Sequence, residues 1–286
     1  MSFDANAYRQ ASLEGWEEAA SGWVRRQEGV RAFGAPASHW MLDAACPQPG
    51  ERVLELAAGL GETGMLAAEM VAPLGGVIVS DQAEAMLAGA RKRAIALGLS
   101  NVEFQVLNAE WIDLPLASVD VVLCRWGYML MADPAAALGE TRRVLRPGGR
   151  VALAVWDALE RNPWALEPAQ ELIARGLTPA LDPAAERPPG PFALGDRARV
   201  KELLENAGFA EIHVDAVELT RRHPDFEDLW DATLDLSRNF HDAVLSCPEP
   251  EIERIKASLA ERFAPYTATD GTLTVPGVTL LASAGA

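Results

Sequence analysis

The stretch "RVLELAAGLGETGMLA", residues 52–67, begins as an apolar run, continues as a loop of small residues and ends in a helical pattern. A strand that passes through such a loop directly into a helix is typical of the first unit of an open α/β sheet. Gly59, Gly61 and Gly64 have the spacing of the dinucleotide fingerprint, and Asp81 ends the next apolar run, where an acid would bind ribose hydroxyls. The stretch therefore predicts a nucleotide-binding loop.

Apolar runs alternate with helical patterns outward from this loop. The helical patterns lie at 64–72, 83–97 and 134–145, and the apolar runs are "RVLELA", "GGVIVSD", "VEFQVLN", "VDVVLC" and "RVALAVW". Alternation of this kind indicates βαβ units, and runs that are apolar throughout are typical of strands buried on both faces. We predict an α/β fold with a doubly wound, mostly parallel, Rossmann-like sheet whose core spans about residues 50–156.

Further elements flank this core. Two helical stretches within 12–45 precede it, and a helix opened by Asp196 as N-cap and closed by Gly208 follows a loop rich in proline and glycine. Because the last apolar run comes only after a helical insertion, we expect a seven-stranded sheet in which strands six and seven pair and the insertion lies above the sheet as a lid. The expected units are an N-terminal helical segment at 1–45, the cofactor-binding core at 46–160 and a continuation of the sheet at 161–224. The helical lid at 225–268 and a terminal strand at 269–286 follow.

The charge and composition narrow the range of partners. A formal net charge of −16 is unfavourable for binding a phosphate backbone, so nucleic acid is not an expected substrate. No apolar run has the length of a membrane span and no secretion signal is visible, which predicts a cytoplasmic protein without membrane association. The three cysteines are far apart in sequence, so neither a disulfide framework nor a metal site is expected.

Glu55 decides between ligands for the loop. Its carboxylate ends the first strand, where it would repel a pyrophosphate and attract an ammonium group. A ligand with adenosine at one end and a cationic amino acid at the other suits both Glu55 and Asp81. S-adenosylmethionine is such a ligand, and S-adenosylhomocysteine would be its product.

The segment from Glu51 to Trp156 resembles class I S-adenosylmethionine-dependent methyltransferases of the small-molecule type related to ubiquinone- and menaquinone-biosynthesis enzymes. The resemblance is carried by four elements in order: "VLELAAGLGETG", "VSDQAEAML", "VLNAEWIDLPL" and "RRVLRPGGRVALAVW". Two positions depart from the family pattern. Ala57 stands at the first loop glycine, and Asn108 replaces an aspartate while still offering a carbonyl acceptor.

The resemblance implies roles for particular residues. Asp81 would bind the ribose, and Cys124 and Arg125 would approach the sulfonium and amino group through backbone atoms. The methionine end would lie on Glu55, Ala57, Gly59 and Gly61, and the adenine would lie beside Gln82, Met86, Asn108, Ala109 and Glu110. Since the sulfonium is already activated, methyl transfer needs mainly alignment and exclusion of water.

Aromatic residues outline the expected acceptor pocket. An apolar cavity of this kind would suit a small hydrophobic or aromatic acceptor, although the same rings could simply pack the lid against the core. The candidates for the pocket are Trp16, Trp23, Trp126, Tyr128, Trp230 and Phe240. His241 shares helical spacing with Trp230 on an apolar face; it is either a core histidine or a weak candidate for a general base.

Two other functions remain open at this point. One is an NAD-dependent oxidoreductase, which Glu55 and the lack of a Tyr-x-x-x-Lys motif disfavour. The other is a cofactor-binding protein without catalysis, because of Ala57 and Asn108. The acceptor atom leaves no mark on the sequence, and the N-terminal helices are candidates for a homodimer contact.

Overall fold

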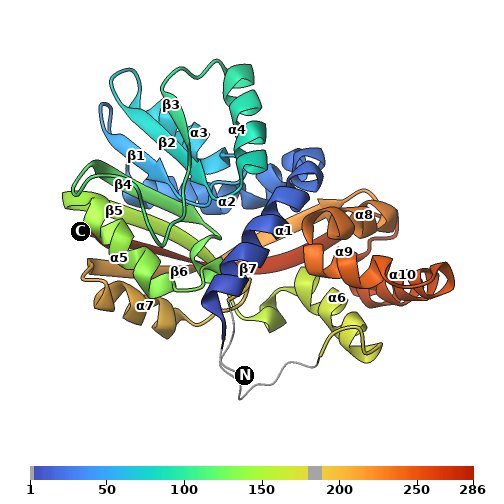
Figure 1. Cartoon of the computed structure of the whole chain (residues 1–286). Helices are drawn as coiled ribbons and strands as arrows, with labels where there is room; N and C mark the ends of the chain where they lie inside the picture. The colour runs from blue at the N-terminus through green and yellow to red at the C-terminus, as the bar shows by residue number, and fades with distance from the viewer. Residues whose placement is uncertain (1–2, 180–188) are drawn as a thin grey trace.

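The computed structural model describes residues 3–179 and 189–286 and shows a seven-stranded sheet flanked by helices (Figure 1). The strand order is β3-β2-β1-β4-β5-β7-β6. All pairs from β3 to β5 are parallel, and β7 lies antiparallel to both β5 and β6. The predicted fold class is confirmed, including the pairing of strands six and seven. The strands are β1 (Arg52–Glu55), β2 (Gly76–Asp81), β3 (Val102–Val106), β4 (Val119–Arg125), β5 (Leu145–Trp156), β6 (Ala210–His223) and β7 (Leu273–Gly285).

Helices cover both faces of the sheet. Residues of α5 and α7 pack on one face, and residues of α2, α3 and α4 pack on the other. Short 3₁₀ turns occupy 128–130, 159–161 and 264–266. The α-helices are α1 (Ala5–Arg25), α2 (Gln27–Ala45), α3 (Glu62–Val71), α4 (Glu84–Leu97), α5 (Pro134–Val144), α6 (Pro163–Ala174), α7 (Arg197–Asn206), α8 (Phe226–Leu236), α9 (Arg238–Leu245) and α10 (Glu249–Phe263).

Helix α1 begins earlier than the sequence patterns indicated. The side chain of Asp4 accepts hydrogen bonds from the backbone N–H groups of Asn6 and Ala7, so the helix starts at Ala5 and not near residue 12. Asp196 caps α7 in the same way, as expected, by accepting from the N–H of Ala198. The extra turns of α1 matter because they carry residues that line the cavity described below.

The helical insertion α8–α10 lies between β6 and β7, where the sequence placed it. It packs with α6 around a separate apolar core and forms the right-hand part of the view in Figure 1. Helix α1 lies between this insertion and the side of the sheet that carries α4, and it contacts both α4 and α8. The proline- and glycine-rich loop expected at 178–196 lies in part outside the described residues. Within the described part of the chain, no helix combines the length and apolarity needed to cross a membrane.

The first strand occupies the switch point of the sheet. β1 pairs with β2 on one side and with β4 on the other, so the chain order reverses there. Ligands of open α/β sheets bind beyond the carboxyl ends of the strands at this point. The loop of residues 56–61 therefore stands where a cofactor would bind.

Candidate active site

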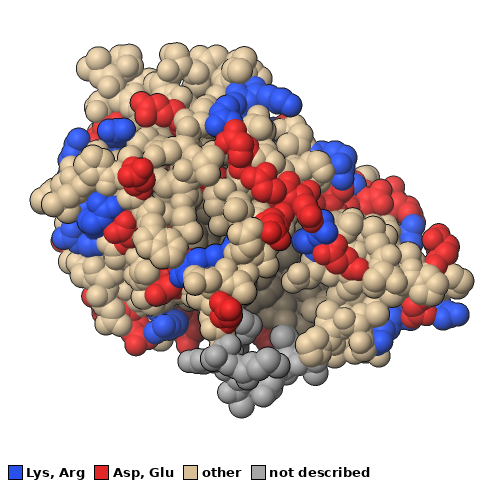
Figure 2. Space-filling view, in the orientation of Figure 1, with Lys and Arg blue, Asp and Glu red and all other residues tan. Residues whose placement is uncertain are grey.

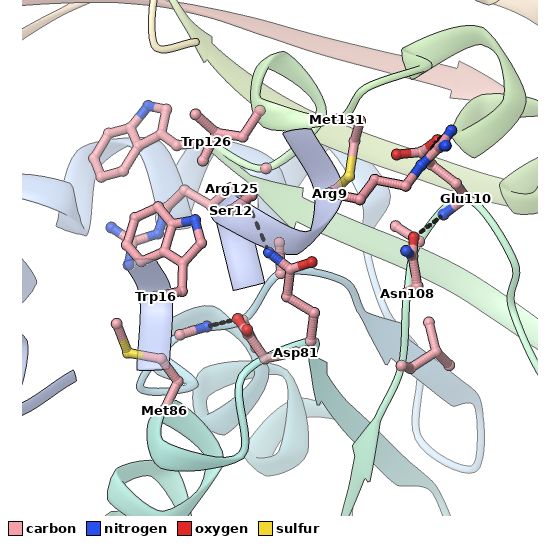
Figure 3. A pocket seen from close by; sticks show the side chains of 18 of the residues that line it. Arg9, Ser12, Trp16, Asp81, Met86, Asn108, Glu110, Arg125, Trp126 and Met131 are labelled. Carbon is pink, nitrogen blue, oxygen red and sulfur yellow. Dashed lines mark hydrogen bonds and ion pairs between the residues drawn. The ribbon is translucent and has the colours of Figure 1, made fainter. Parts of the chain in front are cut away.

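A cavity opens above the carboxyl ends of β1, β2, β3 and β4 and is closed on its other side by α1 (Figure 3). The residues that follow these strands supply its floor, and α1 supplies its cover. The lining residues are Tyr8, Arg9, Ser12, Trp16, Trp23, Ala57, Ala58, Gly59, Leu60, Glu62, Asp81, Gln82, Met86, Leu107, Asn108, Ala109, Glu110, Arg125, Trp126, Gly127, Leu130, Met131 and Ala132.

The loop after β1 turns through left-handed backbone conformations. Gly61 has φ +75°, which favours glycine, and a Cβ there would lie 3.3 Å from Val79 Cγ1 of β2 and 3.4 Å from Ala90 Cβ of α4, so glycine serves both the turn and the close packing of these elements. Ala57 has φ +48°, and it keeps its methyl group because Gly127 faces it: a Cβ at Gly127 would lie 2.6 Å from the Cβ of Ala57. Gly127 therefore leaves the space for an alanine at position 57, where the family pattern has a glycine.

Asp81 ends β2 and holds this loop in place. Its Oδ2 accepts a hydrogen bond from Gly59 N at 2.8 Å and its Oδ1 accepts one from Ala83 N at 2.9 Å. Burial raises the pKa of this carboxyl despite those backbone donors. Next to it, Gln82 donates from Nε2 to Ser12 Oγ of α1 at 3.2 Å. Asp81 thus presents a preorganised carboxylate at the centre of the cavity floor.

Glu55 ends β1 beneath the same loop. It is only 2% exposed, and its Oε2 has no hydrogen-bond partner among the described residues. Burial raises the pKa of Glu55 to about 8, although the charge of Arg125 and the N–H of Gly64 act in the opposite direction. A buried acceptor without a donor is costly unless a ligand supplies one. Glu55 is therefore suited to a cationic group.

The residues after β3 line the end of the cavity farthest from the indole rings in Figure 3. Asn108 Oδ1 accepts from Glu110 N at 2.8 Å, which fixes the turn that carries Ala109. Arg9 of α1 donates from Nε and Nη2 to Glu110 Oε2 at 3.1 and 2.5 Å, and Ala132 N donates to its Oε1. This ion pair attaches α1 to the sheet.

A second arginine lies at the opposite end. Arg125 forms a 3.0 Å ion pair with Glu62, which also pairs with Arg93, and its guanidinium carbon lies 4.6 Å from the ring centroid of Trp126. The sequence implied a backbone role for Arg125, and the structure adds this buried side-chain contact. Figure 3 shows Arg125 near the indoles of Trp16 and Trp126.

Helix α1, rather than the insertion, covers the cavity. Among the described residues, none of those lining the cavity comes from α8–α10. Trp16 and Trp23 line it from α1, in an edge-to-face pair with centroids 5.5 Å apart. Tyr8, Arg9 and Ser12 also line the cavity from α1, and they were not among the site residues predicted from the sequence. Recognition of Asp4 as the N-cap would have extended the predicted helix to include them.

Several candidates lie away from the cavity. Tyr128 is fully buried and shares a 2.6 Å hydrogen bond with Thr141, because the 3₁₀ turn after β4 directs its ring into the core. Trp230 and Phe240 pack against each other inside the insertion core. Cys124 is also absent from the lining; its thiol is fully buried behind Gly127, and burial raises the pKa of this thiol to about 12. The role inferred for Cys124 through its backbone atoms stays a prediction.

His241 does not lie on the apolar face of a continuous helix. The extended backbone of Ser237 separates α8 from α9 and changes the helical phase. The imidazole is 38% exposed and Nδ1 lies 3.1 Å from Asp242 Oδ1. Neither the core interpretation nor contact with the cavity holds for this histidine in the structure.

The fold and the cavity together define a class of protein: an α/β protein with a switch-point site for a ligand that carries both a ribose and a cation. Comparison with known proteins gives the family. A family model described as a methyltransferase domain matches residues 47–208. The chain therefore belongs to the methyltransferase family, and its identification as a class I S-adenosylmethionine-dependent methyltransferase is confirmed.

Individual relatives agree with this assignment. The chain is 27% identical over 173 residues to the ubiquinone/menaquinone biosynthesis C-methyltransferase UbiE of Teredinibacter turnerae, covering 57% of this chain and 69% of that protein. It is 30% identical over 207 residues to the nocamycin O-methyltransferase of Saccharothrix syringae, covering 70% of this chain and 74% of that protein. The solved structure of the YcgJ protein from Bacillus subtilis superposes with a TM-score of 0.57 at 19% identity and shows the same fold. The superposition covers 88% of this chain and 98% of that one.

Proposed function

We propose that this protein transfers a methyl group from S-adenosylmethionine to a small hydrophobic or aromatic acceptor. One observation carries the proposal: two buried carboxylates, Glu55 and Asp81, stand at the ends of neighbouring strands without a basic side chain as hydrogen-bond partner among the described residues. A sulfonium nucleoside brings an ammonium group for the first and ribose hydroxyls for the second. A pyrophosphate would bring negative charge to both.

Side chains in and beneath the cavity fit each part of this cofactor. Glu55, which lies beneath the loop of residues 56–61 and is not one of the lining residues, would accept from its ammonium, and Asp81 would accept from its ribose. Asn108 keeps a carbonyl lone pair for the adenine amino group, because its Oδ1 accepts one backbone hydrogen bond and can accept two. Met86 is buried at the cavity wall and offers an apolar surface to the adenine ring. When bound, the cofactor supplies an electrophilic methyl group.

The chain itself contributes positioning and exclusion of water. Trp16 and Trp126 enclose the end of the cavity where Arg125 lies, and α1 closes it from above. No histidine or lysine lines the cavity in the described part of the chain, so we assign no general base. The arrangement favours catalysis by alignment in a desolvated site. The named activities of the relatives include both C- and O-methylation, and we assign neither acceptor atom here.

Calorimetric titration with S-adenosylhomocysteine, S-adenosylmethionine, NAD and NADH tests the proposal. We expect saturable binding of the sulfur nucleosides only, and about a hundredfold weaker binding in Asp81→Ala, since two charge-assisted hydrogen bonds are lost. Asp113→Ala removes an exposed acid nearby and is the control. Asp81→Asn retains one acceptor for the loop and guards against local unfolding.

An acceptor panel completes the test. Release of S-adenosylhomocysteine that depends on an added aromatic or hydrophobic acceptor would establish turnover. Tight cofactor binding without turnover across the panel would instead favour a binding protein without catalysis. Binding of NAD with no response to the sulfur nucleosides would overturn the cofactor assignment.

A further inference from the structure

Arg221 lies in the part of β6 that extends past the end of β5. β5 ends at Trp156, which pairs with Thr279, whereas Arg221 pairs with Val275 farther along β7. The residue therefore stands beyond the carboxyl edge of the parallel strands, on the same edge of the sheet as the cavity. Its guanidinium carbon lies 4.5 Å from the ring centroid of Phe33 and 4.1 Å from that of Trp164.

This guanidinium has no anionic partner within the described residues. None of the ion pairs or side-chain hydrogen bonds found there involves Arg221, and its Nε is buried without a partner. Burial lowers the pKa of Arg221 to about 10, so the side chain still carries its charge at neutral pH. Arg125, which contacts Trp126, forms an ion pair with Glu62. The two arginines share one aromatic cluster but only one is paired.

The aromatic cluster connects Arg221 to the cavity. The ring of Phe33 stacks on Trp126 at 5.9 Å and on Trp156 at 5.7 Å, and Trp156 meets Trp164 at 4.9 Å. Trp126 lines the cavity beside Arg125. Phe33 and Trp156 are buried in this cluster, whereas Trp126 and Trp164 are partly exposed, so these two indoles are the ring surfaces available to a ligand between the cavity and Arg221.

The Arg221 guanidinium is a cation without a counter-ion among the described residues. A buried cation without a counter-ion is unfavourable for folding, and aromatic faces return only part of the lost hydration. The side chain as a whole is partly exposed although its Nε is buried, so the terminal N–H groups remain within reach of a ligand. A guanidinium binds a planar carboxylate with two parallel hydrogen bonds, and the flanking rings suit an aromatic body.

We propose that Arg221 binds the carboxylate of an aromatic methyl acceptor whose ring packs against Trp126 and Trp164. The assignment rests on the proposed methyl transfer and narrows its acceptor to aromatic carboxylic acids. Arg221 sets specificity by holding the acceptor, and takes no part in the chemical step.

Direct binding tests this without turnover. Tryptophan fluorescence is followed during titration with 1-naphthoate, its neutral isostere 1-naphthamide, and inorganic phosphate. We expect saturable quenching by 1-naphthoate, with affinity about tenfold or more weaker in Arg221→Met and intermediate in Arg221→Lys, which keeps the charge without the planar fork. Arg222→Met removes the exposed neighbouring arginine of β6 and should leave binding unchanged.

The outcomes separate the possibilities. Equal affinity for 1-naphthoate and 1-naphthamide, or no effect of Arg221→Met, would make Arg221 a purely structural cation and overturn the proposal. Phosphate that competes as well as 1-naphthoate would overturn the aromatic carboxylate in favour of a general oxyanion site. S-adenosylhomocysteine should bind Arg221→Met as it binds the unaltered protein. If the unaltered protein does not bind S-adenosylhomocysteine, the proposed function is refuted. Binding of 1-naphthoate through Arg221 would be a separate result that this failure does not affect.

In turnover, Arg221→Met should raise the KM of aromatic acids about tenfold and change kcat by less than about threefold. A fall in kcat at unchanged KM would contradict a role in holding the acceptor.

Discussion

Two buried glutamates, Glu55 at the end of β1 and Glu171 on α6, are each 2% exposed but have opposite surroundings. Burial raises the pKa of both. At Glu171, hydrogen bonds from Arg175, Ser258 and Arg262 reverse the effect and leave the pKa below its ordinary value. At Glu55 nothing reverses it, and Oε2 stays unpartnered among the described residues.

The difference separates structural from functional buried charge. Glu171 is paired within the chain and joins α6 to α10, so its charge supports the insertion. Glu55 Oε2 has no such partner among the described residues, which supports the proposed role of Glu55 toward the cofactor ammonium. Burial alone does not indicate a ligand site; burial of an acid without a donor at a switch point is the stronger indication.

The largest effect is expected on folding at Glu171. Glu171→Gln removes the carboxylate that Arg175 and Arg262 share; because these arginines keep Glu251 and Glu167 as partners, we expect the loss of hydrogen bonds to a charged group, about 2 kcal/mol. Urea unfolding should show this loss, whereas calorimetry should give an unchanged affinity for S-adenosylhomocysteine. A large loss of cofactor affinity in a folded Glu171→Gln protein would remove the contrast with Glu55.

The reciprocal change, Glu55→Gln, should act on binding. Loss of one charged hydrogen bond to the cofactor ammonium predicts about thirtyfold weaker affinity for S-adenosylhomocysteine. Stability to urea at about pH 8 should not fall, because the buried carboxyl no longer has to ionise. If Glu55→Gln unfolds the protein and leaves the affinity intact, Glu55 is structural like Glu171.

The dependence on pH sharpens the same comparison. Glu55 holds its proton up to about pH 8 in the folded protein but releases it near 4.5 when unfolded, so its contribution to stability falls as pH rises between these values. The ammonium ligand prefers the ionised form, so affinity should rise as the pH rises toward about 8, by no more than the roughly thirtyfold loss expected for Glu55→Gln, which resembles the protonated side chain. Calorimetry across this range should lose most of that slope in Glu55→Gln. An equal slope in both proteins would assign the titration to another group.

The smallest effect concerns the cover. Arg9→Met removes the ion pair in which two guanidinium nitrogens donate to Glu110 Oε2, and it should weaken S-adenosylhomocysteine binding about fivefold, with faster dissociation in stopped-flow measurements. Arg31→Met removes an exposed pair with Glu28 on α2 and serves as the matched control. Equal dissociation rates in the two variants would show that the ion pair does not hold α1 closed.

Most of the sheet and the floor of the cavity could be predicted from the sequence. Strands buried on both faces give unbroken apolar runs, and the acids and glycines at their ends follow within a few residues, so Asp81 and Gly59 could be placed by local pattern. The family match then confirmed the class of enzyme. On the face shown in Figure 2, acidic and basic side chains are intermingled.

The cover and the insertion could not be predicted in the same way. Arg9 meets Glu110 across 101 positions, and no local pattern encodes such a pair. Periodicity ran through Ser237 because the break there depends on backbone conformation, and it placed His241 wrongly. Aromatic residues were ambiguous for a related reason: Trp126 lines the cavity and Tyr128, two residues later, points into the core.

The two walls of the cavity differ in their origin along the chain. The floor lies within the matched methyltransferase domain at residues 47–208, whereas α1, at residues 5–25, lies outside it. The cover of the cofactor cavity is thus encoded apart from the domain that carries its floor. Exchange of the first helix alone would keep Asp81 and the glycine loop and would replace the side chains that close the cavity above them. The residence time of a bound nucleoside could therefore diverge between relatives through changes in one helix, without a change in the sheet.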